Sequence, residues 1–62
     1  MTESDPAERV RTLLLRGDNV LKHGRSEDKA REAFEEARQV AEEGELDERI
    51  RQLIEHRLEQ LG

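Results

Sequence analysis

The feature that most constrains this chain is a run of small apolar residues at helical spacing near its middle. They recur at steps of three and four, which places them on one side of a helix with 3.6 residues per turn. The set consists of Ala30, Ala33, Phe34, Ala37, Val40 and Ala41. Because alanine occupies little space, a neighbouring helix can approach this face closely, and Phe34 is its one large aromatic side chain. The pattern predicts a central helix that other helices cover.

Cap residues divide the chain into three predicted helices. The expected ranges are 6–23, 27–43 and 48–60, after a frayed polar lead at 1–4. Asp5, Ser26 and Asp47 have side-chain oxygens that can accept the free N–H groups of a first helical turn. Gly24 and Gly44 stand where the first two helices should end. The short turn between the first two predicts an antiparallel hairpin.

Apolar stripes on the two outer helices complete the expected core. On the first helix the stripe is Val10, Leu13, Leu14, Gly17, Val20 and Leu21. On the third it is Ile50, Leu53, Ile54, Leu58 and Leu61, with Leu46 packing just before it. Gly17 costs a helix about 1 kcal/mol relative to alanine, so we expect another backbone to cross there. The expected fold is a single all-α domain over 1–62, a hairpin followed by a C-terminal capping helix.

Composition narrows the classes of function. The chain has 62 residues, of which 32% are hydrophobic and 44% charged, and a domain of this size buries only about 60% of its unfolded surface. A core this thin favours self-association. The net charge of -5 disfavours nucleic-acid binding, and no apolar run is long enough to cross a membrane. With an acidic N-terminus unlike a targeting peptide, we expect a cytoplasmic protein.

The predicted hairpin resembles a tetratricopeptide (TPR) repeat, whose pattern is W-x2-L-G-x2-Y, then A-x3-F, then Pro. The matching positions are Leu13, Gly17, Val20, Ala30 and Phe34. Arg16 replaces the leucine of the pattern, the turn is one residue longer, the final proline is missing, and the third helix does not repeat the signature. The chain thus resembles one degenerate TPR hairpin with a capping helix.

The resemblance implies a binding surface on the first helix, since TPR modules bind peptides with the first helix of each pair. Arg11, Leu15, Asp18 and Lys22 share one side of that helix, beside its core stripe. A leucine between charges can anchor a protein or peptide partner, or a second copy of the chain. The alternative is a solvated face with an Asp18–Lys22 ion pair and one exposed leucine, which is common on protein surfaces.

Candidates for chemistry are few. His23 and His56 lie in different predicted helices without a third ligand at zinc spacing, so we expect no metal and no cofactor. Three short helices rarely form the concave site that paired catalytic carboxylates need, so we expect no enzyme activity. Arg57 interrupts the apolar stripe of the third helix. We expect its stem to pack on the core with the guanidinium in water, and a carboxylate of the middle helix or of an acidic partner as the alternative.

Two hypotheses for function follow. The first is a TPR-like protein-interaction module, an adaptor or assembly piece that forms a two-fold homodimer. The second is a structural or regulatory helical-bundle dimer without a peptide groove, in which the third helix pairs with its counterpart and Leu58→Asp would destroy assembly. A nucleic-acid binder is disfavoured because its candidate residues point in different directions beside an acidic middle helix. These residues are Arg9, Arg11, Arg16 and Arg25.

Overall fold

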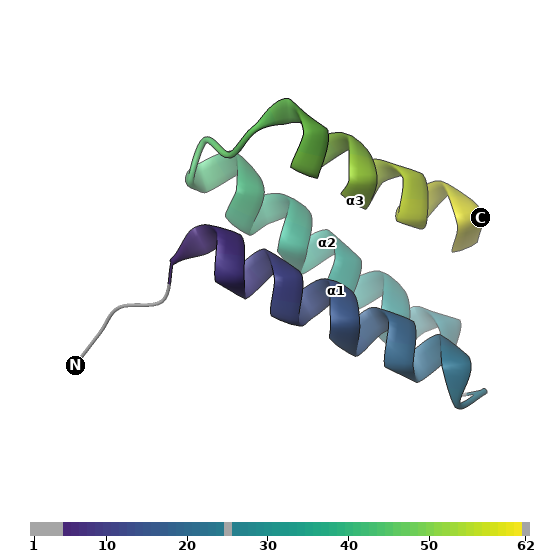
Figure 1. The fold of residues 1–62 in the computed structure, drawn as a ribbon. Helices are drawn as coiled ribbons and strands as arrows, with labels where there is room; N and C mark the ends of the chain where they lie inside the picture. The colour runs from purple at the N-terminus through teal and green to yellow at the C-terminus, as the bar shows by residue number, and fades with distance from the viewer. Residues whose placement is uncertain (1–4, 25, 62) are drawn as a thin grey trace.

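Three helices make up the fold in the computed structural model, which describes residues 5–24 and 26–61. They are α1 (Pro6–Lys22), α2 (Glu27–Glu43) and α3 (Glu48–Leu61), and these residues form no strand (Figure 1). The all-α, three-helix fold is confirmed. The frayed lead predicted at 1–4 lies outside the described residues.

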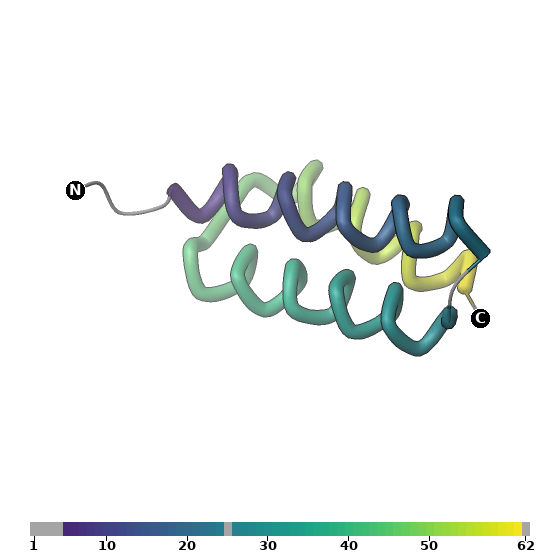
Figure 2. Tube along the Cα trace, turned by 90° about the horizontal axis from the view of Figure 1, so that it is seen from below, coloured from purple at the N-terminus to yellow at the C-terminus, as the bar shows by residue number. Residues whose placement is uncertain are grey.

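The helix α2 is the centre of the arrangement. It runs antiparallel to α1, and α3 then turns back along α2, so that α1 and α3 run in the same direction (Figures 1 and 2). Both outer helices pack mainly against α2 rather than against each other. The Cα trace measures 34 × 26 × 13 Å, so the molecule is flattened along one axis.

Side-chain caps set the starts of all three helices, as the sequence predicts. In each case a side-chain oxygen accepts the backbone N–H two residues further along. The pairs are Asp5 with Ala7 at 3.3 Å, Ser26 with Asp28 at 3.1 Å, and Asp47 with Arg49 at 3.3 Å. The helix starts are thus encoded locally.

The two connections end their helices differently. Gly24 adopts a left-handed backbone with φ of 71°, as expected for a glycine after a helix. After α2 the left-handed residue is Glu45, with φ of 52°, and Gly44 remains in the right-handed region. Gly44 is instead required to be small: a Cβ there would lie 2.8 Å from the Cβ of Pro6 at the start of α1.

The core forms around Phe34, which has no exposed surface. Its ring occupies the space beside Gly17 of α1, where an added Cβ would lie 2.4 Å from Cε1 of Phe34. Position 17 must therefore be glycine because the ring of Phe34 lies against it, and not because another backbone crosses there as we expected. The other buried apolar residues are Val10, Leu13, Leu14, Ala30, Ala33, Ala37, Val40, Ala41, Ile54 and Leu61.

Two leucines that we assigned to the core are exposed. Leu21 on α1 retains 37% of its surface and Leu53 on α3 retains 44%. In both stripes other residues cover α2, and on α3 the buried ones are Ile54 and Leu61. The stripe of α3 is therefore narrower than its sequence pattern indicates.

Candidate protein-interaction surface

Exposed leucines gather on the two outer helices. Within the described residues the exposed large apolar side chains are Leu15 (57%), Leu21 and Leu53, on α1 and α3. The face of α2 that is turned away from the core is polar and charged by comparison. Three exposed leucines are a large share of the apolar residues in so small a chain. The largest exposed apolar side chains of the described residues therefore lie on α1 and α3 and not on α2.

An ion pair joins α1 to α3 beside these leucines. Nε of Arg57 donates to Oδ1 of Asp18 at 3.2 Å, and Nη2 donates to Oδ2 at 2.9 Å. The two side chains are half-buried, with 29% and 42% of their surface exposed. Parallel, two-point contact of this kind is the strongest arrangement of an arginine with a carboxylate. It is a polar link between α3 and α1.

This pair corrects two expectations. The guanidinium of Arg57 does not lie free in water, and its partner belongs to α1 rather than to the middle helix. Asp18 is held by Arg57, in place of the Asp18–Lys22 pair that we considered. A separation of 39 residues in sequence hides such a contact from any local pattern.

The structure places the four predicted binding residues as follows. Arg11, Leu15 and Lys22 are exposed on α1, while Asp18 is partly covered and bound to Arg57. Steps of three and four place all four on one side of α1, where Asp18 reaches α3 and Leu15 lines a hollow on the outward side. Three of them remain accessible to a partner, and the fourth contacts α3.

Two shallow hollows accompany the leucines. One of about 480 Å³ lies on the outward side of α1 and is mainly apolar. It is lined by Thr12, Leu15, Arg16, Asn19, Val20 and His23. The second, also about 480 Å³, lies where the ends of α1 and α3 meet, over the ion pair and Leu21. Open hollows of this kind accept side chains of a partner protein and do not enclose a small molecule.

Charge differs between the outer helices and α2. The exposed part of α2 is acidic: Glu27, Asp28, Glu32, Glu35, Glu36, Glu42 and Glu43. The exposed part of α1 carries mainly basic groups: Arg9, Arg11, Arg16 and Lys22. Arg38 of α2 lies 3.9 Å from Glu42 and 3.7 Å from Glu55 of α3, a second and looser charge contact between helices. The exposed charge of α1 is therefore mainly positive and that of α2 mainly negative.

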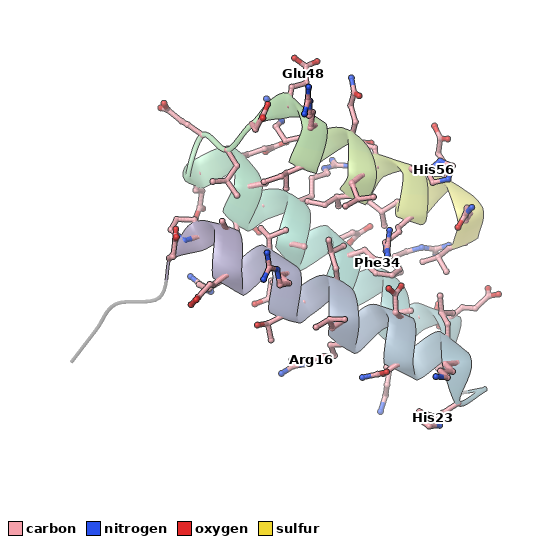
Figure 3. All side chains as sticks on the ribbon, viewed as in Figure 1. Arg16, His23, Phe34, Glu48 and His56 are labelled. Atoms are coloured by element: carbon pink, nitrogen blue, oxygen red, sulfur yellow. The ribbon has the colours of Figure 1, made fainter. Side chains whose placement is uncertain are left out.

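The histidines do not form a site together. His23 is the C-cap of α1, and His56 lies on α3 (Figure 3). His56 and Gln60 lie 3.2 Å apart through their Nε2 atoms. Across residues 5–24 and 26–61 no group of three or more His, Cys, Asp or Glu side chains is placed to hold a metal ion. In the same part of the chain, no helix is both long and apolar enough to span a membrane.

Comparisons with known proteins add no relative to this description. Family models, curated proteins and solved structures give no significant match to the chain. The function must therefore be argued from the surface itself.

Proposed function

We propose that this protein is a small TPR-like interaction module that acts as an adaptor or assembly piece and self-associates as a dimer. The observation that carries the proposal is the exposure of Leu15, Leu21 and Leu53 on the two outer helices. Apolar surface that a chain leaves uncovered, when its core is already short of apolar residues, is best explained by contact with protein.

The packing of the hairpin supports the TPR-like part of the proposal. Of the residues that carry the resemblance, Leu13, Gly17, Ala30 and Phe34 are buried. Gly17 and Phe34 lie directly against each other, so the glycine and the aromatic of the pattern form one contact. The spacing of these residues thus has a common physical cause, the close approach of α1 to α2.

The chemistry of α1 indicates the partner. Leu15 supplies an apolar anchor, and Arg11 and Lys22 on the same helix side supply positive charge. A segment that combines an apolar side chain with carboxylates complements this surface. The apolar contact supplies affinity, while the charges orient the segment and speed its association.

Photo-crosslinking tests the assignment of this surface. A crosslinking amino acid replaces Leu15 in one protein and Gln39, exposed on α2, in a matched control. We expect the first protein alone to capture a specific host protein. Leu15→Ser should then weaken binding of that purified partner by about tenfold or more, the loss typical of an interface anchor.

Two results would contradict the proposal. Capture of the same proteins from Leu15 and Gln39 would show that the contact is not specific to α1. Unchanged affinity of the purified partner for the Leu15→Ser variant would show that the leucine is an ordinary exposed side chain. Circular dichroism of the variant provides the folding control.

The second candidate function is the structural or regulatory dimer in which copies pair through α3. Exposure of Leu53 favours it, since this side chain lies on α3 and keeps 44% of its surface accessible. Leu53→Ser should abolish the dimer in this case, and Leu15→Ser should leave it intact. The opposite result favours association through α1.

A further inference from the structure

The helix α3 is the least firmly attached part of the fold. It buries two residues, Ile54 and Leu61, whereas α2 buries six. It packs along α2, and the Arg57–Asp18 pair is its polar link to α1. The hairpin of α1 and α2, by contrast, is held by the tight fit of Phe34 against Gly17. If one helix leaves the others, it is α3.

The connection before α3 is strained in a way that the other connection is not. Glu45 adopts a left-handed backbone with φ of 52°, which is costly for any residue other than glycine. The hydrogen bond from Leu46 N–H to the Ala41 carbonyl, 3.0 Å long, and that from Glu45 N–H to Glu42, 3.2 Å long, hold the turn. At the α1–α2 turn glycine takes the corresponding conformation without this cost.

We propose that two copies of this chain dimerise by exchanging α3. The connection around Glu45 opens, and α3 of each copy packs on α2 of the other copy. This inference rests on the proposed self-association and names its route. The surface that α3 leaves is complementary to α3, so the helix that fills it is the α3 of the second copy.

The exchange preserves the contacts that hold α3 in one chain. Ile54 and Leu61 return to the same apolar surface, and Arg57 pairs with Asp18 of the partner subunit. Opening of the connection releases the left-handed conformation of Glu45. The outer side of α1, with Leu15, stays free for another protein. Exchange therefore reconciles self-association with an adaptor role.

Charge reversal in separate chains tests the exchange. Asp18→Arg alone places two cations together in one chain, and Arg57→Asp alone places two carboxylates together. In an exchanged heterodimer, Arg57 of the Asp18→Arg chain meets Asp18 of the other chain. The aspartate introduced at position 57 meets the arginine introduced at position 18, so both contacts again join a cation to a carboxylate. We expect native mass spectrometry of the mixture to show the heterodimer well above the statistical half, with higher thermal stability than either variant alone.

Each outcome decides the matter. A statistical mixture of dimers, without added stability, overturns the exchange while leaving self-association and the proposed function intact. A wild-type protein that stays monomeric overturns both. The double variant Asp18→Arg/Arg57→Asp is the control, since it restores the pair within one chain and should fold and assemble as the wild type does.

A second variant tests the hinge without touching the ion pair. Glu45→Gly removes the backbone penalty from the closed monomer. Because both chains lose this penalty in the closed monomer, the monomer becomes more favourable relative to the dimer. The dimer Kd should therefore rise roughly 30-fold. Sedimentation of Glu45→Gly and of the control Glu43→Gln measures the change. An unchanged Kd for Glu45→Gly means that the connection does not open, and overturns the proposal.

Discussion

The substitution Gly17→Ala tests the packing on which the fold depends. At a free position within a helix this change stabilises a protein by about 1 kcal/mol. Here the new Cβ would lie 2.4, 2.7 and 2.9 Å from Cε1, Cζ and Cδ1 of Phe34. Carbon atoms in contact prefer roughly 3.5–4.0 Å, so the ring must retreat by about 1 Å.

The magnitude follows from the surroundings of the ring. Phe34 has no exposed surface and is enclosed by buried neighbours, so it cannot move without disturbing them. Overpacking of a core costs about 1–3 kcal/mol, which exceeds the helical gain when three ring carbons overlap. We expect a net loss of about 1–2 kcal/mol in the free energy of unfolding, and a fall in Tm of roughly 5–15 °C.

Urea unfolding at one fixed protein concentration, followed by circular dichroism, measures this loss. Asn19→Ala is the matched control, because Asn19 is exposed on the same helix and its replacement should stabilise by a few tenths of a kcal/mol. The double variant Gly17→Ala/Phe34→Leu should recover much of the loss, giving a coupling energy of about 1 kcal/mol. A stabilising Gly17→Ala, or strictly additive effects, would refute the reasoning.

Further changes test the caps and the stripe of α3. Ser26→Ala removes the oxygen that accepts the Asp28 N–H and should cost about 1 kcal/mol in urea unfolding. Gly24→Ala forces a side chain into a left-handed backbone and should lower stability by about 1 kcal/mol, a loss that thermal unfolding detects. Leu58→Asp buries a charge in the half-covered stripe and should cost more than about 2 kcal/mol, whereas Leu53→Asp should change stability by less than about 0.5 kcal/mol. Equal effects of the two leucine substitutions would contradict the burial pattern.

This pattern also changes how the two dimer hypotheses are separated. The sequence favoured Leu58→Asp as the discriminating variant, since it should destroy a dimer paired through α3 yet only weaken the fold of a module that associates through α1. In the structure Leu58 packs against the core, so its replacement damages the fold itself. Leu53 is the better probe because it lies on α3 and is exposed.

Local features of the fold could be predicted from the sequence because their causes are local. Asp5, Ser26 and Asp47 cap their helices through atoms two residues away, and the small-residue stripe identifies the side of α2 that is buried. Periodicity reports which side of a helix is apolar. It does not report how closely the next helix approaches, so contacts between helices and the exact extent of burial could not be predicted.

The features that the sequence did not predict arise from contacts between helices. Arg57 and Asp18 meet because α3 returns parallel to α1. The sequence suggested the local partner Lys22 for Asp18 and water for the guanidinium of Arg57. Leu21 and Leu53 continue their apolar stripes but extend past the area that α2 can cover. The interaction surface therefore includes two leucines that periodicity had assigned to the core.

Sedimentation equilibrium of the wild-type protein from low to high micromolar concentration measures whether the chain self-associates. We expect an apparent mass that rises from the 7.2 kDa of one chain toward twice that value. A mass of 7.2 kDa at every concentration would contradict it.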